Sequence, residues 1–138
     1  MQLTQIQIRL VQRSFGRAAT KKRLIATLFY DRLLELDPSL RPMFKGDMEE
    51  QGRKFMRMLA LIVSRLHEPE ELKRRIEAAS QRHNDVGVRP EHYLTVGAAL
   101  LWALEQGLGK EFTPAMREAW LAAYDVIAQI ANPYASTS

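Results

Sequence analysis

The sequence contains no cysteine, which excludes a disulfide framework, a zinc–thiolate site and a cysteine nucleophile. It also has no uninterrupted apolar run of the roughly 18 residues that a membrane-spanning helix requires. The segment before Arg9 lacks the continuous apolar stretch of a signal peptide. From these absences we expect a cytoplasmic protein with no membrane span.

Sequence signals for strands and for several enzyme classes are missing as well. There is no Asn-Gly or Asp-Gly hairpin turn and no sustained alternation of apolar and polar residues, so strands are not predicted. A glycine-rich phosphate loop, a His-Glu-x-x-His zinc motif and a nucleophile elbow are also absent. The acidic pairs at 49–50 and 70–71 lie at expected helix starts, where the helix dipole favours negative charge. We interpret them as capping features rather than as acid–base pairs.

The charge balance is only mildly basic, with 20 Lys and Arg against 16 Asp and Glu. The basic clusters at 21–23 and 73–75 fall on helix faces that we expect to be solvated. Nucleic-acid binding would require a basic stripe interleaved with exposed aromatic residues. Most aromatic residues here occupy apolar-periodic positions instead, so we predict no nucleic-acid partner.

The composition is typical of one globular domain: 138 residues, of which 46% are hydrophobic and 26% charged. Prolines 38, 69, 90 and 114 mark helix starts, where the missing N–H costs little. We predict an all-α fold of about seven helices, one of them short, over about 4–15, 20–36, 38–44, 48–66, 69–83, 90–108 and 114–131. A single domain is expected over 1–131, followed by a flexible tail over 132–138.

Apolar side chains recur in these helices at steps of three and four residues, which is the spacing of one helix face. Gly16 marks a candidate break after the first helix, and Gly109 is expected to close the sixth. The predicted inward positions are Ile6, Leu10 and Val11, then Leu24, Leu28, Phe29, Leu33 and Leu36, then Phe55, Leu59, Ile62 and Leu66, and finally Met116, Trp120, Tyr124, Ile127 and Ala131.

His83 falls in line with one of these apolar stripes. Leu72, Ile76 and Ala79 share a helix face, and one further step of four residues reaches His83. One interpretation is a core histidine whose ring nitrogens are satisfied by neighbouring backbone groups. The other is a ligand: the helix is expected to end within a turn, which would leave the imidazole beside a loop, in reach of a cofactor between helices.

Four stretches of the chain, taken together, resemble a known family. They are LFYDRLL (28–34), RPMF (41–44), QGRKF (51–55), and RRIEAASQRHNDVGV (74–88) followed by PEHYLTVG (90–97). In order and spacing they are similar to those of a globin, specifically a bacterial single-domain globin related to the haem domain of flavohaemoglobins. The resemblance runs from about Leu24 to Ala131 and implies the globin fold, with helices packed around a haem pocket.

The resemblance implies haem b as the cofactor and His83 as the proximal iron ligand. In that role the imidazole binds iron through one nitrogen, and its other nitrogen donates a hydrogen bond, for example to a backbone carbonyl one turn earlier. Phe44, Val88 and Tyr93 correspond to positions that pack against the haem. Lys54 could reach a haem propionate or be an ordinary surface lysine, and the sequence leaves both open.

On the distal side, where a gas would bind, the resemblance places Tyr30, Gln51 and Phe55. A hydroxyl and an amide N–H aimed at dioxygen would stabilise its partial negative charge, each by roughly 1.5–3 kcal/mol. The alternatives are a core tyrosine with its hydroxyl at the surface and a solvated glutamine. His67 and His92 do not fall at the distal position, so a bis-histidyl iron is not expected.

Two features bear on the activity that the resemblance implies. The last helix offers only Ala, Gln, Ile, Ala and Asn at 128–132, where flavohaemoglobins carry a glutamate that polarises the proximal histidine. The bulk of Phe55 beside the open iron position should also slow ligand access. Together they point to a slow, tight oxygen binder rather than a fast carrier.

Three functions remain open on the sequence. The first is reversible binding of dioxygen and other diatomic gases such as CO and NO, for oxygen storage, scavenging or delivery. The second is a nitric oxide dioxygenase that works with a separate reductase, since the chain ends at Ser138 without a reductase domain. The third is a gas sensor or a haemless interaction module, and the retained His83 disfavours the haemless module. A monomer or a homodimer would suit each of them.

Overall fold

The computed structural model describes residues 3–44, 46–75 and 92–131, and within them every regular element is a helix. The labelled elements are α1 (Gln5–Ala19), α2 (Lys22–Leu36), the 3₁₀ helix η1 (Pro38–Met43), α3 (Met48–Ser64), α5 (His92–Leu108), the 3₁₀ turn η2 (Gly109–Glu111) and α6 (Pro114–Ala131). Residues 69–75 are helical too. The predicted all-α fold is confirmed.

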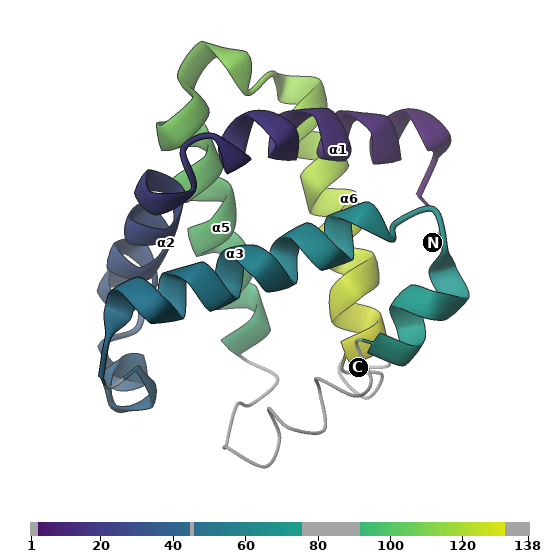
Figure 1. The fold of residues 1–138 in the computed structure, drawn as a ribbon. Coiled ribbons are helices and arrows are strands. Elements are labelled where there is room, and N and C mark those ends of the chain that lie inside the picture. Colours follow the sequence, from purple (N-terminus) through teal and green to yellow (C-terminus); the bar gives the residue numbers. More distant parts are fainter. Residues whose placement is uncertain (1–2, 45, 76–91, 132–138) are drawn as a thin grey trace.

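The helices are arranged in crossed layers (Figure 1). α2 packs most extensively against α5 and also lies along α3, while α1 packs against α6 and α3. α5 and α6 contact each other as well. No helix of the described part is long and apolar enough to cross a membrane.

Most predicted boundaries agree with the structure to within about two residues, but Gly16 does not break the first helix. α1 continues through it to Ala19. Val11, Phe15 and Ala18 on this helix are buried, and together they outweigh the roughly 1 kcal/mol that a glycine costs inside a helix. At the other end, Thr4 forms a capping box with Gln7, which fixes where the helix begins.

The prediction that a residue faces the core is wrong at three positions. Ile6, Leu24 and Leu36 are 70%, 48% and 43% exposed. Where two apolar residues adjoin, periodicity does not decide which one faces the core. In α2 the buried face is that of Ile25, Phe29 and Leu33 rather than that of Leu24. Ile6 and Leu36 lie in the first and last turns of their helices.

α2 and α3 approach closely at one point. A Cβ atom on Gly52 of α3 would lie 3.0 Å from the Cβ of Ala26 on α2, so a larger residue at position 52 would push the helices apart. Gly97 has a similar role on α5, because its missing Cβ leaves room for the ring of Tyr124 on α6. Two small residues thus set the distances between neighbouring helices.

A buried hydrogen bond joins α1 to α6. The indole Nε1 of Trp120 donates to the Ser14 hydroxyl oxygen at 2.7 Å, and that hydroxyl lies 2.8 Å from the carbonyl oxygen of Leu10. Ser14 is fully buried and Trp120 almost so. Because a buried polar group without a partner is costly, this serine satisfies the one polar atom of the large indole ring.

We predict that Ser14→Ala lowers the free energy of unfolding by about 1–2 kcal/mol. Leaving the indole N–H unpaired costs about 1–3 kcal/mol, and the better helix propensity of alanine offsets up to about 0.5. Urea unfolding followed by circular dichroism measures the change. Ser64→Ala is the matched control, since this exposed serine donates only to the carbonyl of Leu61 on its own helix. Equal effects of the two changes would contradict the role of Ser14.

Candidate functional site

Four aromatic rings gather where α2, the end of η1 and α3 meet. Phe29 stacks on Phe55, with ring centroids 4.2 Å apart and planes 8° from parallel. Tyr30 packs edge-on against Phe29, Phe44 and Phe55, at centroid distances of 5.0, 5.3 and 6.0 Å. This aromatic cluster brings together three residues that the sequence analysis assigned to the haem pocket, namely Tyr30, Phe44 and Phe55.

The hydroxyl of Tyr30 is buried with the cluster. Only 8% of this residue is exposed, and its hydroxyl donates to the backbone carbonyl of Gln51 over a long 3.4 Å. Burial raises the pKa of Tyr30 to about 12, because the charged phenolate would be poorly solvated there. The phenol therefore keeps its proton at neutral pH and acts as a hydrogen-bond donor.

Gln51 is half-buried in the first turn of α3, so the Tyr30 hydroxyl reaches it across the α2–α3 contact. Its surroundings also include a small cavity of about 190 Å³ that Asp47, Glu50 and Lys54 line. Lys54 is 65% exposed and its Nζ lies 4.0 Å from a carboxylate oxygen of Glu50. Lys54 therefore extends from the molecular surface beside Gln51 and does not join the aromatic cluster.

Two capping residues hold the chain between α2 and α3 in place. Asp37 accepts a hydrogen bond from the backbone N–H of Ser39 at the start of η1, and Asp47 accepts one from the N–H of Glu49 at the start of α3. Between them, the backbone N–H of Phe44 donates a hydrogen bond to the carbonyl of Arg41, and Phe44 is the C-cap of η1. These hydrogen bonds fix the ends of η1 and the start of α3, and so they position the Phe44 ring against Tyr30.

The remaining predicted site residues are described only in part. His83 and Val88 lie outside the described residues, and Tyr93 lies in the first turn of α5, where the backbone alone is described. His67 lies three residues beyond the end of α3, and it is exposed. His92 is half-buried at the start of α5.

The described helices fit a flat, apolar cofactor such as haem. α3 packs closely along α1 and α2, but within the described residues it makes no comparably close contact with α5 or α6. Apolar side chains on these helices remain only partly buried, including Phe55 and Ile62 on α3, Val96 on α5 and Ile127 on α6. Partly covered apolar surfaces on several helices are what an inserted apolar ring system would bury.

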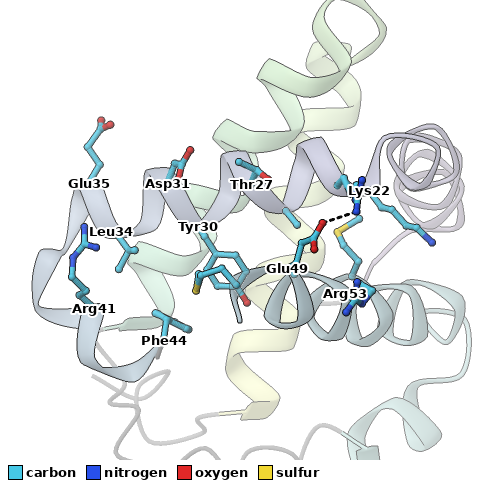
Figure 2. A pocket seen from close by; sticks show the side chains of 15 residues that line it. Lys22, Thr27, Tyr30, Asp31, Leu34, Glu35, Arg41, Phe44, Glu49 and Arg53 are labelled. Atoms are coloured by element: carbon cyan, nitrogen blue, oxygen red, sulfur yellow. Dashed lines mark hydrogen bonds and ion pairs between the residues drawn. The ribbon is translucent and has the colours of Figure 1, made fainter. Parts of the chain in front are cut away.

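A groove of about 980 Å³ lies on another side of the same cluster, between α2, η1 and α3. Figure 2 shows Tyr30 in its middle, with Lys22 and Arg53 toward one end and Glu35 and Arg41 toward the other. Its lining includes Tyr30 and Phe44 but neither Gln51 nor Phe55. Sequence reasoning missed this groove, because its apolar lining residues Met48 and Met56 read as ordinary core methionines.

Comparisons with known proteins agree with this fold. The family model described as Globin matches residues 27–131. A flavohemoprotein of Bordetella pertussis is 31% identical over 105 residues, which are 74% of this chain and 26% of that protein. A flavohemoprotein of Rhodopirellula baltica is 29% identical over 131 residues, covering 93% of this chain and 32% of its own length. The chain thus spans about a quarter to a third of these relatives.

Solved structures show the same architecture. An engineered carbene transferase from Rhodothermus marinus, derived from a protein assigned as a nitric oxide dioxygenase, superposes with a TM-score of 0.84 at 25% identity, over 98% of this chain and 94% of that one. A flavohemoglobin from Malassezia yamatoensis, determined with FAD and haem bound, has a TM-score of 0.77 at 24% identity, over 95% of this chain and 36% of that one. The chain belongs to the globin family, and its relatives are the globin domains of flavohemoproteins.

Proposed function

We propose that this globin holds haem b and binds dioxygen reversibly, for oxygen storage, scavenging or delivery. Membership of the globin family supports haem-based binding of a gas. The observation that carries the proposal is the buried, protonated Tyr30 hydroxyl, held by a single long hydrogen bond within the aromatic cluster. Carbon monoxide and nitric oxide would bind at the same place.

Haem supplies an iron centre with one position open to a diatomic gas. In the proposal His83 holds the iron on the opposite side, while Phe44, Val88 and Tyr93 pack against the ring. Lys54 could still contact a haem propionate or be an ordinary surface lysine. Its exposed ammonium is free enough to turn toward a carboxylate, because its contact with Glu50 is a loose one of 4.0 Å.

Tyr30 is the residue that would retain dioxygen. Its present hydrogen bond to the Gln51 carbonyl is at the long end of the range, so turning the hydroxyl toward the gas gives up little. A hydrogen bond to a partly negative acceptor contributes roughly 1.5–3 kcal/mol, or about tenfold to a hundredfold in retention. The pKa of about 12 keeps the donor proton in place at neutral pH.

Gln51 and Phe55 complete the distal side of the proposal. The side-chain amide of Gln51 would supply a second N–H donor. The Phe55 ring, stacked on Phe29, would narrow the space beside the iron and slow ligand access. This combination favours a slow and tight binder.

The alternative function is a nitric oxide dioxygenase that works with a separate reductase. The likeness to the Rhodothermus marinus protein and to flavohemoproteins favours it. We place either function in the bacterial cytoplasm, in a monomer or homodimer. Absorption spectra of the purified protein in ferric, ferrous and oxygenated forms test gas binding. Adding nitric oxide to the oxygenated form and measuring nitrate over repeated turnovers with a reductase tests the alternative.

We predict that His83→Ala removes most of the bound haem and lowers the melting temperature, because a cofactor that binds only the folded state stabilises it. Haem content from the absorption spectrum and a thermal melt measure both effects. His67→Ala and His92→Ala are the controls and should leave the spectrum unchanged. Normal haem content in the His83 variant would show that another residue binds the iron.

We expect Tyr30→Phe to speed dioxygen release by about tenfold or more, since one charge-assisted hydrogen bond is lost. Carbon monoxide, which is less polar when bound, should respond less. Stopped-flow displacement of each gas gives the release rates. Tyr124→Phe is the matched control, because it removes a hydroxyl from a ring packed against Gly97 and outside the aromatic cluster. Equal acceleration of both gases would mean that Tyr30 controls access rather than hydrogen bonding.

We also expect Tyr30 to ionise late in an alkaline titration. Its pKa lies at about 12 in the folded chain against 10.0 for an ordinary tyrosine. Since the folded value is the higher one, ionisation of this phenol does not affect stability below the ordinary pKa. As pH rises from the ordinary pKa through the folded pKa, the free energy of unfolding falls by up to about 3 kcal/mol, because the unfolded chain ionises more readily. The measurement is the difference in tyrosinate absorbance between the wild type and Tyr30→Phe as pH is raised. We expect this difference to appear near the folded pKa. Its appearance near the ordinary pKa would contradict the burial of this hydroxyl.

A further inference from the structure

We propose that the groove between α2 and α3 is a route by which diatomic gases reach the distal side, with Tyr30 as the wall between groove and site. The inference rests on the proposed function, because it needs a gas-binding site behind Tyr30. The proposed function says nothing of how a gas enters, whereas this inference assigns a path and the residues that control the rate of gas entry. The groove holds about 980 Å³ and opens on the molecular surface. Figure 2 shows the side chains that line it.

The chemistry of the lining suits a small neutral gas. The walls of the groove include the apolar side chains of Leu34, Phe44, Met48 and Met56 beside the ring of Tyr30. Charged side chains also line the groove, and two of them, Arg23 and Glu49, neutralise each other in an ion pair at 2.5 Å. Dioxygen, carbon monoxide and nitric oxide dissolve better in apolar surroundings than in water, so the apolar walls of the groove would favour them.

Tyr30 connects this groove to the proposed distal side. It lines the groove, yet its ring meets Phe55 edge-on and its hydroxyl reaches the carbonyl of Gln51. The long hydrogen bond of 3.4 Å restrains the ring only weakly. Thermal motion of Tyr30 against the half-buried Phe44 would therefore open the wall for a molecule of two atoms.

The alternative opening beside Gln51 is less favourable for a gas. The cavity there is about 190 Å³ and is lined by Asp47, Glu50, Gln51 and Lys54. Charged and amide groups hold water by hydrogen bonds, and an apolar gas arriving there must displace it without replacing those bonds. The α2–α3 groove is larger and has apolar side chains in its walls, so this cost is smaller there.

A route has a kinetic signature that a hydrogen bond does not have. Narrowing a passage raises the barrier by the same amount for a gas that enters and a gas that leaves. The association and dissociation rates then fall by the same factor, and the equilibrium affinity stays constant. Losing a hydrogen bond to the bound gas instead changes mainly the dissociation rate and lowers the affinity.

The test compares two substitutions of the same kind on the same helix. Met48→Trp places an indole in the groove, whereas Met58→Trp places one at an exposed position of α3 that does not line it. With the haem-loaded protein, we expect Met48→Trp to slow carbon monoxide association and dissociation about threefold or more at constant affinity. Met58→Trp should match the wild type. Met48→Ala, which widens the groove, should speed both rates.

Equal rates in the Met48→Trp and Met58→Trp variants, with both folded by circular dichroism, would overturn the route. So would a slower association with a changed affinity, which would place the Met48 side chain at the binding site itself. A second readout needs no gas at the iron. Xenon added to the protein should shift the methyl resonance of Met48 but not that of Met58 in a carbon–proton correlation spectrum, and equal shifts would overturn the proposal. A protein that takes up xenon in this way yet binds no carbon monoxide would overturn the proposed function alone.

Discussion

The close approach of α3 to α2 at Gly52 and Ala26 is the contact on which the arrangement of the site depends. It brings the first turns of α3 against the middle of α2, so that Tyr30 reaches the backbone of Gln51 and Phe29 stacks on Phe55. A Cβ atom at position 52 would already lie 3.0 Å from that of Ala26, so a larger side chain there would strain this approach. The short 3₁₀ segment then closes the cluster by adding Phe44.

The cluster carries a polar atom at an energetic cost. A tyrosine hydroxyl withdrawn from water with only one long hydrogen bond is poorly satisfied, and a phenylalanine at position 30 would fold with little loss. In the Ser14–Trp120 pair, by contrast, the buried indole N–H donates a hydrogen bond of 2.7 Å to the buried hydroxyl. The first arrangement leaves hydrogen-bonding capacity unused, and the second uses it fully. That difference is why Tyr30 suits a ligand and Ser14 suits the core.

Much of the fold could be predicted from local sequence, because prolines, capping residues and apolar periodicity act over a few residues. The start of α6 at Pro114 and the turn at Gly109 are examples. The exposure of Leu24 could not be predicted, because α2 packs on both α5 and α3 and its face depends on partners far away in the chain. The continuation of α1 through Gly16 likewise depends on packing that local propensity does not contain.

The same distinction holds within the site. The motifs around Tyr30, Phe44, Gln51 and Phe55 point to residues that lie together in the structure. The resemblance could identify them because it aligns each motif with a known position of the globin fold. The groove beside them has no sequence signature. Its methionines and leucine are indistinguishable from core residues until the crossing of α2 and α3 leaves them lining an opening.

Tyr30 would then serve two separate purposes through two parts of one side chain. Its hydroxyl would set how strongly a gas is held, which is an equilibrium property, and its ring would close the groove, which would affect rates alone. A globin built for slow, tight binding needs both a strong donor and a narrow path, and placing them on one residue couples them. The neighbouring lining residues, Met48 and Leu34, carry no donor. They are therefore the positions at which the rate of gas access can change while the affinity stays the same.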